Sequence, residues 1–591
     1  MPLATQRHKA AEAVEAPRLS AGRVSVSLSP TGTALRDIAF DREVVFRGLA
    51  FVARDADWGT LPLAAAPKIR RTGEELEIEA AGSGVHVNGD LSWRVLFRIT
   101  PSGVEVRSSV HSSQGFRTNR TGLVVLHGLS ACRGQEALIT HSDGRTSRAP
   151  FPVRVSPHQP FMDIGSMAHR TVRGTSVRIV FEGEVFETED QRNWTDASYK
   201  TYSRPLARPF PYMISPGETV EQSVRIDFEP GASAPTPADE RPHMEAQAAI
   251  PRLATGLPVV RPVLDERTLA ALETLGFDSI ALEIDPEEEG WADRLAGHLA
   301  AFPGRISLDC RMQGAADPLS VLGMIRDVSA GRRPGRISLW GARQDAVEAA
   351  RALWPGVPIG GGTGAFFAEF NRGSLPSGID YASWTTNPTV HASDDDTLGE
   401  SVEPLADILA TARAKAPGVG FAIGPLTLVM RYNPNATSPE TQRAEPPPDP
   451  RQHSGIAASW LLGTVAGFLD AAVQDLTLFE ASGPKGLIQP DGSLSPAAHL
   501  VARLTSLMGC PAESIVWPYE PRARGLLVQA PRGRVLVLTQ ARSEAAILRV
   551  PEGSWSVCER LGPGGFAASP QAGSGSIEVE GFGVVWLAET S

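Results

Sequence analysis

The run Pro358-Ile-Gly-Gly-Gly-Thr-Gly-Ala-Phe-Phe-Ala-Glu-Phe-Asn-Arg372 decides the predicted fold, because it is apolar, rich in glycine and ends in polar side chains. It predicts a buried strand that delivers Glu369, Asn371 and Arg372 to one end. The run Leu476-Thr-Leu-Phe-Glu480 has the same design, since it is too short for a helix and stops on a carboxylate. Two glutamates at strand ends indicate a repeating βα architecture, in which barrel enzymes keep their chemistry at these ends.

Outward from these two runs, residues 250–510 hold eight short apolar runs, most of them separated by amphipathic helical patterns. The runs are 257–264, 278–284, 304–311, 335–341, 356–368, 378–385, 418–426 and 475–480. One helical pattern between them, 265–275, has Asp265 as its expected N-cap. Eight such units over about 250 residues predict a (β/α)8 TIM barrel that carries the catalytic site.

All-β structure is expected on both sides of the barrel. Residues 23–245 show period-two alternation between turn residues, which predicts an N-terminal antiparallel β-sandwich. A polar leader is expected at 1–22, and the end of the sandwich segment, about 230–249, is typical of a linker or wrapping segment rich in Pro, Ala and Glu. Residues 511–591 return to alternation and predict a small C-terminal β-domain without a site of its own.

Composition excludes several classes of function. The chain has 591 residues, and its 56 basic against 67 acidic residues give a formal charge of −11, which argues against nucleic acid as a partner. The four cysteines show neither a CxxC pair nor Cys/His ligand spacing, so no disulfide framework or structural zinc is indicated. No apolar run is long enough to span a membrane, so we expect a cytoplasmic protein without membrane partners. The oligomeric state is not indicated.

Known catalytic and cofactor motifs are absent or weak. There is no G-x-S-x-G, H-E-x-x-H or Walker sequence, so α/β serine hydrolases, zincins and P-loop enzymes lose support. Gly360-x-Gly362-x-x-Ala365 superficially matches a dinucleotide loop, but glycines that permit close strand packing or loop geometry explain it better. We therefore expect neither a cofactor nor a metal.

Polar residues after the predicted strands supply the candidate site. Glu480 is the candidate general base and Glu369 the acid or its partner, although the two roles could be reversed. Candidate donors to the substrate are Asn371, Asn387, His391, Arg431 and Asn433. A solvated loop carboxylate is the alternative for either glutamate, and a capping group for His391. The Pro-rich insertion 433–453 is too long for a plain connection and is expected to form a lid or wall.

A second polar cluster follows a strand of the sandwich, in Phe186-Glu-Thr-Glu-Asp-Gln-Arg-Asn-Trp-Thr-Asp-Ala-Ser-Tyr-Lys-Thr-Tyr202. Glu189, Asp190, Arg192 and Asn193 gather around Trp194 more densely than the wet face of a sheet requires. We expect this stretch to line the active site and to contribute substrate contacts. The alternative is a structural ion-pair network that ties the sandwich to its neighbour.

This stretch, with Ala368-Glu-Phe-Asn-Arg372, Asn387-Pro-x-x-His391 and Asp449-Pro-Arg-Gln452, resembles the D-apionate lactonase family of bacterial sugar-acid catabolism. The resemblance covers the sandwich and the barrel and implies hydrolysis of a furanose-like sugar-acid lactone, D-apionate lactone, to the ring-opened acid D-apionate. The architecture is also similar to that of glycoside hydrolases. A glycoside hydrolase that uses two barrel glutamates and a non-catalytic carbohydrate-binding protein therefore stay open as alternatives.

Overall fold

The computed structural model describes residues 17–56, 58–231, 241–315, 317–436, 442–569 and 575–589. The protein consists of two compact units, 1–192 with 197–236 and 193–196 with 237–591. We call them the sandwich unit and the barrel unit. Most of the expected polar leader, residues 1–16, lies outside the described residues.

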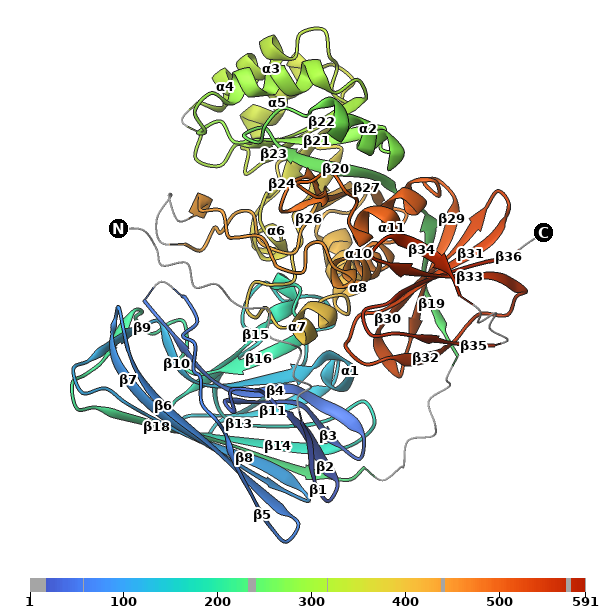
Figure 1. Ribbon diagram of the computed structural model, residues 1–591. Helices are drawn as coiled ribbons and strands as arrows, with labels where there is room; N and C mark the ends of the chain where they lie inside the picture. The colour runs from blue at the N-terminus through green and yellow to red at the C-terminus, as the bar shows by residue number, and fades with distance from the viewer. Residues whose placement is uncertain are drawn as a thin grey trace. The chain divides into compact units, whose positions relative to one another are not determined.

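The sandwich unit consists of antiparallel strands that hydrogen-bond into a single 18-stranded network (Figure 1, blue to teal). Its strands are β1 (Arg18–Ala21), β2 (Val24–Leu28), β3 (Ala34–Phe40), β4 (Glu43–Arg54), β5 (Lys68–Thr72), β6 (Glu75–His86), β7 (Gly89–Thr100), β8 (Gly103–His111), β9 (Phe116–Thr118), β10 (Arg120–Gly128), β11 (Glu136–His141), β12 (Thr146–Pro150), β13 (Phe161–Arg170), β14 (Ser176–Glu182), β15 (Phe186–Asp190), β16 (Ser198–Tyr202), β17 (Tyr212–Ile214) and β18 (Thr219–Glu229). Short turns α1 (Leu129–Cys132) and η1 (Gln191–Trp194) interrupt them. Alternate residues, such as Val24, Val26 and Leu28 of β2, enter one apolar core. The expected antiparallel sandwich is confirmed.

Eight parallel strands form the barrel, and pairing of the first with the last closes the ring. They are β20 (Arg252–Pro258), β21 (Ser279–Ile284), β22 (Arg305–Arg311), β23 (Arg336–Trp340), β24 (Ile359–Gly362), β25 (Tyr381–Ser383), β26 (Gly420–Leu426) and β27 (Val473–Ser482), after which β28 (Gly486–Ile488) pairs with β27. The expected (β/α)8 barrel is confirmed.

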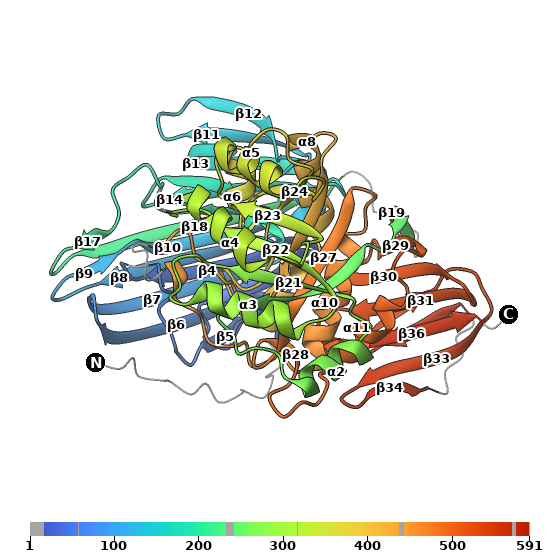
Figure 2. The same ribbon diagram turned by 90° about the horizontal axis from the view of Figure 1, so that it is seen from above.

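In the part of the barrel unit that the structure describes, the helices include α2 (Glu266–Thr274), α3 (Trp291–Ala301), α4 (Pro318–Val328), α5 (Gln344–Leu353), α6 (Phe367–Arg372), α7 (Asp395–Glu400), α8 (Leu405–Lys415), α10 (Gly455–Gly467) and α11 (Pro496–Thr505). Asp265 caps α2 as expected, because its side chain accepts a hydrogen bond from the backbone N–H of Thr268 at 2.8 Å. Helices α3, α4 and α5 lie side by side along strands β21 to β23 (Figures 1 and 2). Among the described residues, no helix combines the length and apolar character that crossing a membrane requires.

The run 356–368 differs from its sequence prediction. Strand β24 ends at Gly362, and α6 begins at Phe367, so Glu369 lies in a helix and not at a strand end. Phe366, Phe367 and Phe370 are all buried. Apolar residues at this spacing suit a helix face as well as a buried strand, and this ambiguity explains the wrong prediction.

The glycines of β24 make room for neighbouring groups, as the sequence suggested. A Cβ on Gly360 would stand 2.2 Å from the ring of Tyr381, and one on Gly362 would stand 2.0 Å from the carbonyl oxygen of Ser383. Gly362 also has a φ of 130°. Gly360 and Gly362 lie within β24 itself and have no room for a Cβ, so packing explains this run better than a dinucleotide loop does.

Gly362→Ala is therefore expected to lower the free energy of unfolding by more than about 2 kcal/mol, because backbone must move to admit the methyl group. Gly378→Ala is the matched control, since Gly378 has a φ of 71° but open space around its Cβ position. That change should cost only about 1 kcal/mol. Chemical denaturation of both variants measures the difference, and equal losses would contradict the packing explanation.

The C-terminal β-domain belongs to the barrel unit. Its strands are β29 (Pro511–Trp517), β30 (Glu520–Ala530), β31 (Gly533–Gln540), β32 (Ala546–Arg549), β33 (Trp555–Gly562), β34 (Gly565–Ala568), β35 (Ser576–Val579) and β36 (Val584–Glu589), and its main sheet packs on α10 and α11. Part of the expected linker, His243–Ala249, forms β19 and pairs with β29 at the edge of this sheet. The sequence did not predict this strand, because its alternating apolar residues are few and small and lie in a stretch rich in Pro, Ala and Glu, where most side chains are exposed.

Candidate active site

Charged side chains converge from the carboxyl ends of five barrel strands. Arg261 follows β20, Glu283 and Asp285 lie at the end of β21, Arg311 closes β22, Arg431 follows β26, and Glu480 lies near the end of β27. In a parallel barrel these ends share one face, where the loops after the strands form the active site. We call this set the charged cluster.

Glu480 is the buried centre of the charged cluster, with 2% of its surface exposed. Arg431 Nη1 donates to its Oε1 at 2.8 Å. Arg261 holds it from the other side, since Nε donates to Oε2 at 2.9 Å and Nη2 to Oε1 at 3.0 Å. Two guanidinium groups therefore compensate the charge of this carboxylate and fix its orientation.

Arg431 also reaches a second buried carboxylate, Glu283. Its Nε donates to Glu283 Oε2 at 2.9 Å, and Arg311 Nη2 donates to Glu283 Oε1 at 2.8 Å. Burial alone would raise the pKa of Glu283, but the charges of Arg431 and Arg311 outweigh it and hold that pKa below its ordinary value. Glu283 is thus a permanent carboxylate, and Arg431 bridges two negative charges.

The Pro-rich insertion adds the outer part of the charged cluster. Arg261 forms an ion pair with Glu445, and Lys485 Nζ donates to Glu445 Oε1 at 2.9 Å. Burial raises the pKa of Glu445, but these two cations more than reverse the effect and lower it to about 2. Arg443, from the same insertion, donates to Asp285 at 3.3 Å. The described part of the insertion therefore forms a charged wall beside Glu480.

The chain matches two family models. Residues 4–231 match the N-terminal domain of D-apionate lactonase, and residues 333–509 match its TIM barrel domain. The chain belongs to the D-apionate lactonase family. It is 30% identical over 528 residues to the D-apionate lactonase of Brucella anthropi, a match that covers 80% of this chain and 84% of that protein. The chain is thus an enzyme of the lactonase class, as its sequence motifs suggested.

Solved structures give weaker likenesses. A GH30 endoxylanase from Clostridium papyrosolvens matches with a TM-score of 0.40 and 9% identity, over 58% of this chain and 98% of that one. A GH51 arabinofuranosidase from Xanthomonas axonopodis pv. citri matches with a TM-score of 0.40 and 12% identity, over 58% and 97% of the two chains. Likenesses this low say nothing about the substrate of the lactonase.

Of the expected site residues, Glu480 and Arg431 lie in the charged cluster of this lactonase, and Glu369 does not. Glu369 is half-buried on α6, and burial raises its pKa while Arg372 opposes the rise. Within the described residues, the side chain of Glu369 makes no hydrogen bond or ion pair with a member of the charged cluster. Asn433 accepts from the backbone N–H of Asn435 at 3.1 Å and shapes a turn of the insertion.

Asn371, Asn387 and His391 instead meet residues 193–196, the short segment that belongs to the barrel unit. Asn371 Nδ2 donates to Asn193 Oδ1 at 3.0 Å. Thr195 Oγ1 donates to the carbonyl oxygen of Asn387 at 2.8 Å, and His391 Nδ1 lies 2.7 Å from Asp196 Oδ2. Trp194 packs with Phe366 and Ala368 among these contacts. Residues 193–196 of the predicted polar cluster therefore contact helix α6 and the segment that follows β25.

Glu189, Asp190 and Arg192 belong to the sandwich unit and are paired there. Lys200 Nζ donates to Glu189 Oε1 at 2.9 Å, and Arg192 Nη2 donates to Asp190 Oδ2 at 2.6 Å. Arg192 is fully buried and also donates to the backbone carbonyl oxygens of Pro152 and Val153. These contacts favour the structural alternative for Arg192 over a substrate contact.

Arg192→Ala should therefore lower the free energy of unfolding by about 3–5 kcal/mol, because the buried Asp190 carboxyl group and the carbonyl oxygens of Pro152 and Val153 would lose their donor. We expect a smaller effect on kcat/KM of the folded fraction. Thermal melts and initial rates on the same preparation measure both quantities. A normal melting temperature with a large loss of kcat/KM would instead make Arg192 part of the site.

Four members of the charged cluster were missing from the predicted set of site residues: Arg261, Glu283, Asp285 and Arg311. Arg261 was not recognised as a strand-end residue because the first strand was expected at 257–264. Strand β20 ends at Pro258, so Arg261 lies in the loop that follows it. Glu283 lies inside its strand, one residue before the end of β21. A correct boundary for the first strand would have marked Arg261 as a strand-end residue, whereas the expected run 304–311 already ended at Arg311, as β22 does.

The charged cluster does not offer a metal site. Guanidinium groups stand between its carboxylates, and their positive charge disfavours a cation there. Among the described residues, the side chains close enough to share a metal ion are His127, Cys132 and His169 of the sandwich unit.

Proposed function

We propose that this lactonase hydrolyses D-apionate lactone, a furanose-like sugar-acid lactone, to D-apionate at the charged cluster. Support comes from the family and from the named activity of the relative in Brucella anthropi. The carrying observation is that Arg431 joins Glu480 to Glu283 at the catalytic face of the barrel. The partner would be a small sugar lactone, used in sugar catabolism in the cytoplasm.

Ring opening needs three groups. Water must lose a proton as its oxygen attacks the acyl carbon, the carbonyl oxygen must carry negative charge in the tetrahedral intermediate, and the ring oxygen must gain a proton as its bond to that carbon breaks. The net change adds one water and yields a carboxylate, a hydroxyl group and one released proton. None of these steps changes an oxidation state.

Arg431 and Arg261 suit the charge-stabilising role. A guanidinium has five N–H groups, and Arg431 directs only part of this set at Glu480 and Glu283, so donors remain for a substrate oxygen. Both arginines are held in place before substrate binds, so little reorganisation is needed as charge develops. A donor of this kind is worth about 10²- to 10³-fold in rate.

Glu480 suits the role of base. A carboxylate offers about four lone-pair positions, and three hydrogen bonds from Arg431 and Arg261 leave one position on Oε2 for water. The same two arginines stabilise the oxyanion that forms beside it. Glu369 lies outside the charged cluster and stays the sequence-based candidate for proton delivery to the ring oxygen, since its raised pKa favours the protonated form.

Glu369→Gln tests this assignment through pH. If Glu369 delivers the proton, the rate of the native enzyme falls as pH rises through the raised pKa of this residue. The variant should lose about 10²-fold in kcat together with that alkaline decline. An unchanged pH profile with a normal rate would remove Glu369 from the mechanism and leave proton delivery to another group.

A glycoside hydrolase remains the competing reaction, and it requires one protonated carboxyl group and one carboxylate. Glu283 does not fit the acid role, because Arg431 and Arg311 keep its pKa low. Incubation of the full-length protein with a panel of aldonolactones in a pH-stat, and with chromogenic aryl glycosides, separates the two reactions. Turnover of lactones alone supports the proposal, whereas release of the aglycone without lactone turnover would replace it.

A further inference from the structure

Three side chains of the sandwich unit lie close together in the structure. In the sequence they are distant from every residue of the charged cluster. His127 lies on β10, Cys132 is the last residue of α1, and His169 lies on β13. One ligand atom from each falls within 4.8 Å of the other two. Their exposed surface is 0%, 0% and 6%, so all three are core residues.

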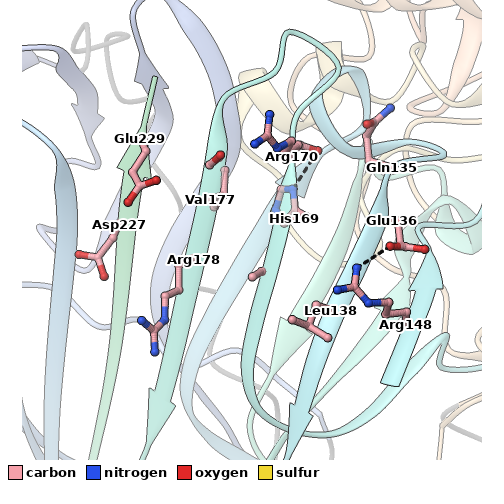
Figure 3. Close-up of a pocket in the computed structure, with 12 residues that line it drawn as sticks. Gln135, Glu136, Leu138, Arg148, His169, Arg170, Val177, Arg178, Asp227 and Glu229 are labelled. Carbon is pink, nitrogen blue, oxygen red and sulfur yellow. Dashed lines mark hydrogen bonds and ion pairs between the residues drawn. The ribbon is translucent and has the colours of Figure 1, made fainter. Parts of the chain in front are cut away.

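In the imidazole rings of His127 and His169, one nitrogen has a hydrogen-bond partner and the other has none among the described residues. Both imidazole rings are buried in the core of the sandwich unit. His169 Nδ1 lies 3.4 Å from the carbonyl oxygen of Arg170, which can only accept, so Nδ1 carries the proton and Nε2 a lone pair (Figure 3). His169 Nε2 is buried without a hydrogen-bond partner among the described residues.

His127 repeats this arrangement with its other nitrogen. Its Nε2 lies 2.8 Å from Thr201 Oγ1, which lies 2.8 Å from Thr188 Oγ1, so a hydroxyl pair orients the ring. His127 Nδ1 is buried and, among the described residues, without a partner. A buried polar atom without a hydrogen-bond partner is destabilising. Aromatic packing with Phe46 and Phe151 explains why the rings are buried, but it does not compensate these two nitrogens.

We propose that His127, Cys132 and His169 bind one first-row transition-metal ion of borderline-soft character, of the zinc or copper class. Imidazole nitrogen and thiolate sulfur are the ligands that these ions prefer. In a tetrahedral site, metal bonds of about 2.0–2.3 Å place such ligand atoms about 3.3–3.6 Å apart, so a small inward movement completes the tripod.

The surroundings of the three ligands fit a cation. Thr201 and Arg170 provide the outer hydrogen bonds that commonly orient metal-bound histidines. On binding, the Cys132 thiol releases a proton to solvent and its sulfur forms the bond to the ion. Glu43, a buried carboxyl residue of β4, lies on the strand that packs beside α1. Thr171 and Thr175 hold that carboxylate in place by donating to its Oε2.

The position of the cluster gives the ion a structural role. His169 also lines an open groove of about 700 Å³ on the sheet, beside Gln135 and Arg170 (Figure 3). Strands β10 and β13 do not pair with each other, so an ion would link two strands and α1 inside the core. This inference does not rest on the proposed lactonase mechanism, because none of the three residues belongs to the barrel unit.

Metal analysis of the purified full-length protein tests the site. After dialysis against Zn²⁺ or Cu⁺ and removal of free ion, we expect about one ion per chain, and the element found distinguishes zinc from copper. Cobalt(II) added to chelator-treated protein should produce a sulfur-to-cobalt charge-transfer band. Cys132→Ser and His169→Gln should each lower the bound metal at least tenfold, whereas Cys558→Ser, a buried cysteine of the C-terminal domain, should not.

Two results would overturn the proposal. One is less than a tenth of an ion per native chain after dialysis with both metals. The other is full metal content in Cys132→Ser and His169→Gln. If a variant does not fold, the native protein provides the test. Chelation should lower its melting temperature, and added metal should restore it. A melting temperature that changes with neither treatment would also overturn the proposal.

Discussion

Replacing Glu480 with glutamine is expected to lower kcat/KM for the sugar lactone by about 10²-fold or more, since the change keeps the size of the side chain and removes the proposed base. The amide also cannot compensate Arg431 and Arg261, which donate to both oxygens of the native carboxylate. We therefore expect a moderate fall in melting temperature as well. Initial rates corrected for the folded fraction separate the two effects.

Asp475→Asn is the matched control. Asp475 is a buried carboxylate on the same strand, β27, and Arg252 donates to it at 2.5 Å at the opposite, amino-terminal end of the barrel. Residues at that end support folding and not catalysis in barrel enzymes. This variant should lose stability and keep its kcat/KM. Near-normal kcat/KM in Glu480→Gln would remove Glu480 from the mechanism.

Replacing Arg431 with methionine is the second large effect that we expect. Methionine fills similar space, but it leaves Glu283 and Glu480 buried without the cation that bridges them. Loss of this donor should lower kcat by about 10²- to 10³-fold, and the broken pairs should cost about 3–5 kcal/mol of stability. Arg431→Lys should rescue little, since an ammonium cannot donate to both carboxylates in a fixed plane.

The stability difference between native enzyme and Arg431→Met should depend on pH. Arg431 helps to hold the pKa of Glu283 below the ordinary value of 4.5, so this interaction stabilises the fold above pH 4.5 and is lost as pH falls through the lowered pKa. The difference should therefore be full at neutral pH and shrink in acid. Denaturation curves at several pH values measure it, and a constant difference would contradict an electrostatic role for Arg431.

The order of barrel strands could be predicted from the sequence because most of them are apolar runs with little ambiguity, as in β21 and β22. The first barrel strand was predicted too far along the sequence, because Leu257-Pro-Val-Val-Arg-Pro-Val-Leu264 is more apolar than the observed strand, Arg252–Pro258. Two prolines in that run argue against a central strand, since proline lacks the N–H that the ladder needs. Greater weight on this rule would have placed Arg261 after the strand.

The candidate site could be predicted only in part, because its contacts join distant parts of the sequence. Arg431 and Glu283 are 148 positions apart, and no local pattern marks them as partners. Selecting polar residues at predicted strand ends identified Glu480 and Arg431. It did not show that Arg431 also donates to Glu283. The dense stretch from Glu189 to Asp196 was noticed, but the sequence could not show that it divides between two units after Arg192.

The most direct test of the account is the rate of ring opening of D-apionate lactone, followed by nuclear magnetic resonance against an enzyme-free blank. We expect the native protein and Asp475→Asn to open the lactone far faster than the blank, and Glu480→Gln to retain at most about 1% of the native kcat/KM. A native rate equal to the blank, or a Glu480→Gln rate equal to that of the native protein, would contradict catalysis at the charged cluster.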